Sequence, residues 1–417
     1  MKKASTLRRS VGVVLTALLM LTWFSPMQRA LRTLPEHITL TQGQESTLLL
    51  GGLTASGEAL TVTSSADETL AEAGAVTVVA RSSGTTEMLL SLFGVPVKRV
   101  EVTVSEEKRL IPGGQALGVA LRTDGVLIVG LSETAEGICP ARECGLRAGD
   151  VIRSVEGAAV TTAEELTALV AAAGARPLTI AFERDGQRRT TTLTPHPDAS
   201  TGAIRMGAWV RDSTAGVGTL SFYDPDTGRY AALGHAVTDG DTGAVLTVSE
   251  GQVLRANVVA VQKGASGAPG ELKGSFLREK ETLGDIRRNT ILGVYGAMDA
   301  PVTNPLYPDG LPVGLRDAVH VGPASILSTV DGGGVAEYAV EIVRVNPQSG
   351  PAPKSMVIRV TDPRLLAKTG GIVQGMSGSP ILQDGRIVGA VTHVFVSDPT
   401  QGYGLYIDWM LGEAEDI

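Results

Sequence analysis

A serine between glycines carries the strongest chemical signal in this sequence. Ser377 lies in the segment Gly-Met-Ser-Gly-Ser-Pro at residues 375–380. A serine hydroxyl becomes an effective nucleophile only when a base lies beside it and backbone N–H groups face the oxyanion that forms. Gly375 permits a turn that aims its own N–H and that of Ser377 at one carbonyl oxygen, and Gly378 keeps a side chain out of the substrate's path. The segment predicts an oxyanion hole from Gly375 and Ser377, and a plain glycine-rich turn with a capping serine is the alternative.

The base for this serine must come from one of five histidines. The serine loop is not G-x-S-x-G, which disfavours an α/β-hydrolase, and it is similar to the G-x-S-G-[SG]-P loop of chymotrypsin-like peptidases. His235 ends an apolar strand at residues 230–237, as the base of such peptidases does, and we expect it to be the base. His393 is the rival, although its alternating apolar strand is more typical of a core histidine.

The acid that would orient the imidazole has the weakest local signal. Asp362 follows a predicted strand at residues 356–360 and could present its carboxylate at the strand's end. The pair Asp362-Pro363 equally fits a helix start, with the aspartate as N-cap and the proline at the first helical position. Four further aspartates stay open as orienting acids: Asp239, Asp241, Asp285 and Asp299.

Composition narrows the classes of protein. The chain has 417 residues, 43% of them hydrophobic and 19% charged, which excludes wholesale disorder. Its 51 glycines and 4% aromatic residues favour short strands and tight turns over a helical bundle. A net charge of −8 without a recurring basic stripe argues against a nucleic-acid partner. Histidine spacing indicates no metal site, and we expect no cofactor.

The two cysteines, Cys139 and Cys144, match neither a CxxC redox pair nor a zinc ligand set. They could form a disulfide bridge in an oxidising compartment. Small buried thiols are the favoured interpretation.

The N-terminal segment predicts a membrane anchor. No charged residue occurs from residue 10 to residue 28, a length of roughly 28 Å as a helix against the ~30 Å core of a bilayer. Four basic residues precede this stretch and two follow it, so the N-terminus should stay in the cytoplasm and the rest be exported. A removable signal peptide is the alternative, although no clear A-x-A site follows. We assign residues 1–30 to this segment.

Residues 31–108 alternate apolar and polar side chains in places and predict a small β domain. Residues 109–195 resemble a bacterial PDZ domain. The resemblance rests on a G-L-x-x-G-D-x-I segment at residues 145–152, on a helix with a Thr162–Glu165 capping box, and on a φ-G-φ loop. That loop, Leu117-Gly118-Val119, would capture a peptide carboxylate while the next strand pairs with the peptide. The alternative is a groove filled by a segment of the same chain.

Residues 196–417 are again rich in glycine and strand-like. The turn sequence at residues 224–228 predicts a hairpin between 218–223 and 229–235. The expected fold is mainly β, with a chymotrypsin-like β-barrel-type serine peptidase domain behind the PDZ module.

Taken together, the anchor, the PDZ-like module and the segments at residues 233–235, 360–364 and 370–380 resemble the stage IV sporulation protein B peptidases of endospore-forming bacteria. The resemblance implies a His-Asp-Ser triad of His235, Asp362 and Ser377. It implies export from the forespore into the space between the two spore membranes, and self-processing. It further implies cleavage of a membrane-bound regulatory subunit of a membrane-embedded metalloprotease complex, which then activates a late sporulation sigma factor. The PDZ domain would serve self-recognition and substrate delivery.

Two other functions compete with this hypothesis. A membrane-tethered PDZ scaffold with an inactive C-terminal domain would bind peptides without turnover. A quality-control protease would degrade unfolded exported chains broadly.

Overall fold

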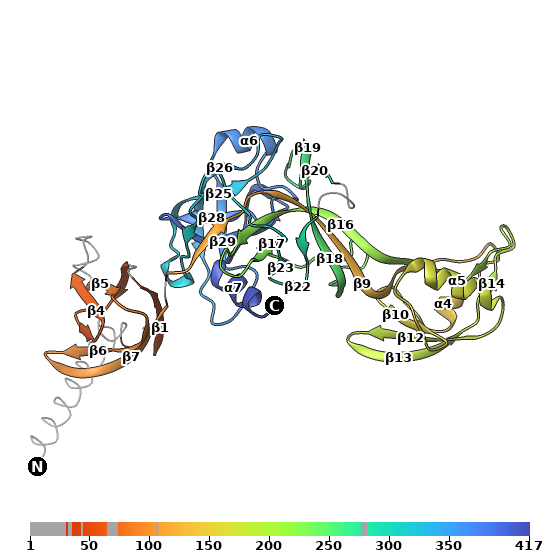
Figure 1. Ribbon diagram of the computed structural model, residues 1–417, viewed down its shortest axis with the longest axis horizontal. Helices are drawn as coiled ribbons and strands as arrows, with labels where there is room; N and C mark the ends of the chain where they lie inside the picture. The colour runs from red at the N-terminus through yellow and green to blue at the C-terminus, as the bar shows by residue number, and fades with distance from the viewer. Residues whose placement is uncertain (1–30, 32–35, 43–44, 65–73, 106, 277–281) are drawn as a thin grey trace, which may run out of the picture. The chain divides into compact units, whose positions relative to one another are not determined.

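The computed structural model describes residues 31, 36–42, 45–64, 74–105, 107–276 and 282–417 (Figure 1). The chain divides into two compact units, Met1–Lys108 and Arg109–Ile417. Within the described ranges, no helix combines the length and the apolar character that crossing a membrane requires. The anchor predicted for residues 1–30 lies outside the described residues.

The first unit is built from two small sheets. Its four-stranded sheet has the order β1-β7-β6-β3, with β1 parallel to β7, and its three-stranded sheet has the order β2-β5-β4. Val100 and Val102 of β7 are fully buried while Glu101 between them is exposed, so the predicted alternation is confirmed. The strands are β1 (His37–Thr41), β2 (Glu45–Leu49), β3 (Thr54–Gly57), β4 (Leu60–Ser64), β5 (Ala75–Ala80), β6 (Gly84–Leu92) and β7 (Val95–Ser105).

A PDZ-like module opens the second unit. The predicted capping box begins its main helix: Glu165 N donates to Thr162 Oγ1 at 3.1 Å and Thr162 N donates to Glu165 Oε2 at 3.2 Å. The helix buries Leu166 and Val170 against the sheet. The elements are β9 (Ala116–Leu131), α4 (Pro140–Glu143), β10 (Val151–Val155), β11 (Ala158–Ala159), α5 (Ala163–Ala173), β12 (Leu178–Arg184), β13 (Gln187–Leu193), β14 (His196–Pro197) and β15 (Ile204–Arg205).

One long ribbon joins this module to the rest of the unit. Strand β16 (Ala208–Tyr223) pairs antiparallel with β9 from Ala208 opposite Leu131 to Thr219 opposite Ala116. No loop separates a PDZ part from a peptidase part along these two strands. The predicted hairpin follows directly, since β16 pairs with β17 (Arg229–Ala232) across a turn that the Asp224 side chain holds.

The remaining strands form two β units. One extends from the β9–β16 ribbon through β17, and the other is a closed antiparallel barrel in the order β25-β26-β27-β30-β29-β28. The first contains β8 (Arg109–Pro112), β18 (Val248–Arg255), β21 (Thr282–Asp285), β22 (Arg288–Thr290), β23 (Gly293–Ala297) and β24 (Leu311–Pro312). Strands β19 (Asn257–Gln262) and β20 (Glu271–Ser275) form a separate two-stranded sheet. The barrel contains β25 (Gly322–Ser328), β26 (Ala336–Val345), β27 (Met356–Val360), β28 (Pro380–Gln383), β29 (Arg386–Phe395) and β30 (Asp398–Tyr406). Helices are few: η1 (Arg316–Ala318), α6 (Pro363–Thr369) and α7 (Ile407–Glu415).

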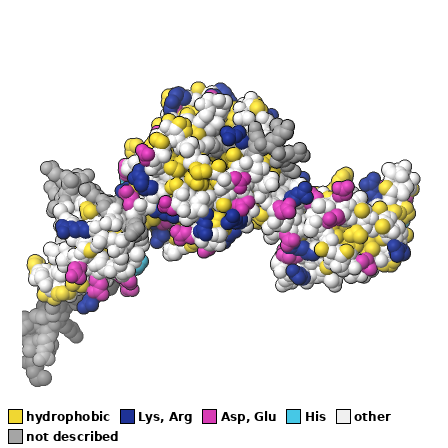
Figure 2. Space-filling model, viewed as in Figure 1, with side chains coloured by type: hydrophobic (Ala, Val, Ile, Leu, Met, Phe, Trp, Pro, Cys, Tyr) yellow, Lys and Arg dark blue, Asp and Glu magenta, His cyan; other side chains and the backbone are white. Residues whose placement is uncertain are grey.

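The prediction of a mainly β chain is therefore confirmed. On the face shown in Figure 2, lysine and arginine side chains are interspersed with aspartate and glutamate side chains. This mixture fits the net charge of −8.

Candidate active site

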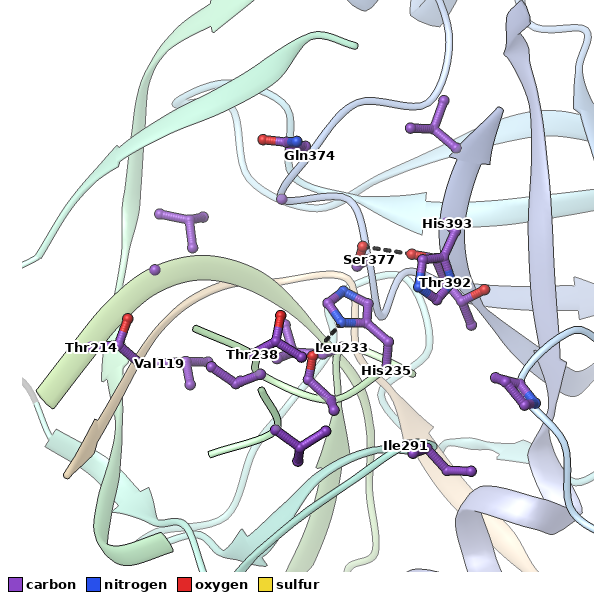
Figure 3. A pocket seen from close by; sticks show the side chains of 18 of the residues that line it. Val119, Thr214, Leu233, His235, Thr238, Ile291, Gln374, Ser377, Thr392 and His393 are labelled. Carbon is purple, nitrogen blue, oxygen red and sulfur yellow. Dashed lines mark hydrogen bonds between the residues drawn. The ribbon is translucent and has the colours of Figure 1, made fainter. Parts of the chain in front are cut away.

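The predicted nucleophile and base line one open pocket of about 790 Å³ between the two β units. Ser377 comes from the loop before β28, and His235 comes from the loop after β17. Figure 3 shows both side chains facing this pocket, with His393 of β29 beside them. Residues that are 142 positions apart are thus brought together at one site.

Hydrogen bonds to carbonyl groups fix the peptide planes of the serine loop. Leu272 N donates to the Gln374 carbonyl at 2.8 Å, and Ser379 N donates to the Met376 carbonyl at 3.0 Å. Because C=O and N–H point in opposite directions in a trans peptide, the Gly375 and Ser377 N–H groups point away from those two donors.

These two N–H groups have no acceptor among the described residues, whereas those of their neighbours Gln374, Met376 and Gly378 do. Both residues line the pocket. Two free donors at fixed angles, one of them on the nucleophile itself, are what an oxyanion hole requires. Their arrangement agrees with the predicted roles of Gly375 and Ser377.

The two glycines of the loop are needed for backbone reasons. Gly375 and Gly378 have φ angles of 94° and 97°, in the left-handed region. A Cβ at Gly378 would lie 2.0 Å from the Thr219 carbonyl oxygen. We predicted that Gly378 keeps a side chain out of the substrate's path. The structure gives a different reason for this glycine, because strand β16 fills the space that a side chain at residue 378 would occupy.

A tight turn places His235 at the pocket. Leu233 and Gly234 have φ angles of 70° and 68°, which end β17 abruptly. The loop after His235 is then held by Asn289, whose side chain accepts from Val237 N and donates to the Val237 carbonyl, each at 2.8 Å. No local pattern in the sequence marks Asn289 for this role.

The imidazole of His235 is oriented by a backbone carbonyl. Its Nδ1 lies 2.8 Å from the Ala236 oxygen. A carbonyl only accepts, so Nδ1 carries the proton and Nε2 keeps a free lone pair. In Figure 3 this second nitrogen lies on the side of Ser377. Burial lowers the pKa of His235, although the bond to Ala236 opposes the shift, so the ring is neutral at pH 7 and can accept a proton.

The serine hydroxyl is hydrogen-bonded to the strand behind it. Ser377 Oγ donates to the Thr392 carbonyl at 2.8 Å. To react, the O–H must turn from this carbonyl to Nε2 of His235. All three residues line the same pocket, and Figure 3 shows the bond from Ser377 to Thr392.

His393 lines the pocket and is not a core residue, so that interpretation was wrong. Its ring centroid lies 5.1 Å from that of His235, with the planes tilted by 42°. Desolvation in the pocket and the nearby charge of His235 lower its pKa to about 4. His235 is favoured as the base by geometry, because the Ala236 carbonyl holds its Nδ1 and its Nε2 lies on the side of Ser377.

The structure does not bring Asp362 to His235. The carboxylate accepts from Arg364 N at 2.8 Å and from Ala339 N at 3.2 Å, and it pairs with the Arg364 guanidinium at 2.7 Å. Asp362 is the N-cap of α6, with Pro363 at the first turn, so the capping interpretation is confirmed. The Arg364 side chain, above all, holds its pKa well below the usual range. The triad placement of Asp362 is corrected because its carboxylate contacts Ala339 and Arg364, whereas it neither lines the pocket nor contacts the His235 ring.

The other aspartates considered as orienting acids have partners elsewhere. Asp239 and Asp241 pair with Arg211, and Asp285 pairs with Arg287. Asp299 lines different pockets from His235. Within the described residues, no carboxylate contacts the His235 ring.

The predicted carboxylate-binding loop of the PDZ module is a strand. Leu117, Gly118 and Val119 lie inside β9 and pair with β16 on one side and β18 on the other. Their backbone groups are used by the two ladders, so the prediction was wrong. Gly118 is required by packing, because a Cβ there would lie 2.8 Å from the Phe276 ring.

Cys139 is buried, and Cys144 is partly buried. Both are free thiols. The favoured interpretation of small buried thiols therefore fits Cys139 and fits Cys144 only in part.

Comparison with protein families gives two matches. The profile described as SpoIVB peptidase S55 matches residues 202–411, about half of the chain, and a PDZ domain profile matches residues 138–184. The first match contains Ser377, His235 and His393. Comparison with curated proteins finds no match.

Comparison with solved structures finds partial likenesses, all of them to proteins under 20% identical to this chain. The PDZ domain of the SdrC-like protein from Listeria monocytogenes is 18% identical and covers 21% of this chain and 87% of its own, with a TM-score of 0.19. The active form of the Rv3671c protease from M. tuberculosis is 17% identical and covers 49% and 74%, with a TM-score of 0.27. The HtrA-type protease AlgW with a decapeptide is 13% identical and covers 49% and 54%, with a TM-score of 0.28.

Proposed function

The chain belongs to the SpoIVB peptidase S55 family and is a serine endopeptidase with a PDZ domain, and we propose that Ser377 is its nucleophile and His235 its general base. The observation that carries this proposal is the pocket that joins Ser377, His235 and the two free N–H groups of Gly375 and Ser377.

In this reaction, Nε2 of His235 takes the Ser377 proton as the oxygen attacks a peptide carbonyl. The N–H groups of Gly375 and Ser377 stabilise the oxyanion, and His235 returns the proton to the leaving amine. The Ala236 carbonyl, which accepts from Nδ1, orients the ring. It faces the imidazolium that forms, which is the position an aspartate takes in other serine peptidases.

The proposal extends to the substrate. Membership of the S55 family supports an exported enzyme that processes itself and cleaves a membrane-bound regulatory subunit of an intramembrane metalloprotease complex, which activates a late sporulation sigma factor. The N-terminal segment would anchor the enzyme or would be removed on export. Neither metal nor cofactor takes part in this proposal.

Purified full-length protein tests the assignment. Ser377→Ala should lower self-cleavage and cleavage of the regulatory subunit by about 10⁴–10⁶-fold and should abolish labelling by a fluorophosphonate. Ser379→Ala is the matched control, because the buried Ser379 Oγ has no hydrogen-bond partner in the described part of the chain. Undiminished cleavage by the Ser377→Ala variant would show that Ser377 is not the nucleophile.

The same assay separates the two competing functions. An inactive PDZ scaffold predicts no fluorophosphonate labelling of the wild-type protein. A quality-control protease predicts that casein is degraded as fast as the regulatory subunit.

A further inference from the structure

The sheet edge beside α5 is occupied by the chain itself. Val126 and Leu127 of β9 pair with β10. On its other side, β9 pairs with β16 from Leu127 to Leu131, where Val210 lies opposite Ile128 and Arg211 opposite Leu127. An extended peptide that binds a PDZ module adds a strand to the sheet edge next to the helix. Here that added strand is the segment Ala208–Asp212, which we call the groove segment.

The groove segment is held by the helix as well as by the sheet. The N–H of Ala163, in the first turn of α5, donates to Asp212 Oδ2 at 2.9 Å. Ala208 and Val210 pack against the cluster that contains Leu166 and Val170 of α5. The segment therefore contacts both walls of the groove and runs antiparallel to β9, as an added peptide strand would.

The groove segment is also tied to the loop that follows the proposed base. Arg211 pairs with the buried carboxylate of Asp239 and, at 2.9 Å, with Asp241. Asp239 in turn accepts from Thr242 N at 2.9 Å and from Thr242 Oγ1 at 2.9 Å. The turn at residues 239–244, four positions beyond His235, thus depends on a side chain of the groove segment.

The far end of the same strand holds the nucleophile loop. Thr219 N donates to the Ser377 carbonyl at 3.0 Å, and Thr219 Oγ1 donates to the Gly375 carbonyl at 2.7 Å. The Thr219 carbonyl accepts from Leu233 N at 3.2 Å, in the turn that places His235. Strand β16 therefore contacts the groove and both proposed catalytic loops.

We propose that the groove segment is the resident ligand of the PDZ groove, and that an extended peptide which displaces it lowers peptidase activity by pulling β16 away from both catalytic loops. The closed state has β16 in the groove with Arg211 paired to Asp239. The open state has a second peptide in its place. The activity readout rests on the proposed function, whereas displacement itself does not. Two states that bind the peptide differently are the requirement for such coupling.

A synthetic peptide with the sequence of residues 207–212 (Gly-Ala-Trp-Val-Arg-Asp, free carboxyl end) is the probe, with a scrambled peptide as control. Added to the full-length protein, it should raise hydrogen exchange in β16 and in residues 374–379. It should lower kcat at least threefold at saturation. The scrambled peptide should change neither.

A disulfide clamp tests displacement directly. Gly130 and Trp209 lie opposite each other on β9 and β16, and a Cβ at Gly130 meets only the Trp209 ring, at 3.6 Å. Measured against its own activity without peptide, the oxidised Gly130→Cys/Trp209→Cys variant should lose the response to the peptide, and reduction should restore that response. A clamp at Ala120→Cys/Ala215→Cys, opposite each other outside the groove, is the matched control and should leave exchange in the groove segment responsive.

Each outcome decides one part of the proposal. Two results would show that the groove segment is not a displaceable ligand of the groove. One is a peptide response in the oxidised groove clamp equal to that of the wild type, and the other is hydrogen exchange in β16 that does not change when the peptide is added. Exchange that rises in β16 while residues 374–379 and kcat stay unchanged overturns the coupling. A protein without peptidase activity refutes the proposed function alone, because the exchange measurements still judge displacement and coupling.

Discussion

Thr219 Oγ1 donates a buried hydrogen bond of 2.7 Å to the carbonyl of Gly375, and this bond connects β16 to the proposed oxyanion hole. Thr219 also uses its N–H and its carbonyl, so all three of its polar groups position catalytic segments. It belongs to neither the serine loop nor the histidine turn. It is the residue on which both depend.

Thr219→Val keeps the shape of the side chain and removes the hydroxyl. The buried Gly375 carbonyl would then lose a partner, which should cost about 1–3 kcal/mol of unfolding free energy. A loosened oxyanion donor should lower kcat by roughly 10–100-fold with little change in KM, below the ~10²–10³ lost when a donor is removed. Thr219→Ser, which keeps the hydroxyl, is the control. Steady-state kinetics with equal activity in both variants would contradict this role.

The two pocket histidines should differ sharply in their contribution. His235→Ala removes the proposed base and should lower kcat/KM by several orders of magnitude, while His393→Ala should lower it by about tenfold or less. Kinetics with a peptide substrate, alongside circular dichroism of each folded variant, decide between them. A larger loss in His393→Ala would transfer the role of base to His393.

The pH dependence of kcat/KM should report the lowered pKa of His235. The base acts in its neutral form, so activity is lost as pH falls through this pKa. Burial lowers it below the ordinary value of 6.5, and the acid limb should therefore have its midpoint below pH 6.5. In His393→Ala, more water reaches His235, and the limb should move upward. A midpoint at or above 6.5 in the wild type would show that the imidazole is not desolvated.

Local patterns in the sequence predicted those elements whose partners lie a few residues away. The capping box at Thr162 and Glu165 and the hairpin turn at Asp224 were right for this reason. The serine loop was also identified, because its left-handed turns demand glycines at fixed spacing.

The failures share a different cause, which is contact with strands distant in sequence. Gly118 fits a binding loop and a buried strand equally well, and only the distant Phe276 ring and β18 decide between them. In the same way, no pattern around Thr219 or Arg211 shows that they hold loops near residues 375 and 239.

Asp362 shows that one short pattern can satisfy two roles, and substitution can separate them. Asparagine is as good an N-cap as aspartate, so Asp362→Asn should stay within about tenfold of wild-type activity. Asp362→Ala should lose about 0.5–2 kcal/mol of unfolding free energy through the lost cap. Denaturant unfolding and kinetics of both variants check this. A ~10⁴-fold loss of kcat in a folded Asp362→Asn protein would restore the aspartate to the triad.

The ion pair between Arg211 and Asp239 offers the last test, because it joins the PDZ module to the loop after His235. Burial alone would raise the pKa of Asp239, but hydrogen bonds from Thr242 and the Arg211 charge bring it below the usual value. Arg211→Met should therefore remove one partner of the buried Asp239 carboxylate. We expect this to lower the unfolding free energy by roughly 1.5–3 kcal/mol. It should also lower kcat, since the turn at residues 239–244 loosens. Asp239→Asn removes the other partner, and the double variant should lose less than the sum of the two single losses if the groups interact. Strict additivity in denaturant unfolding would show that the pair contributes no coupling, and that the base loop is held by Asn289 without help from the PDZ module.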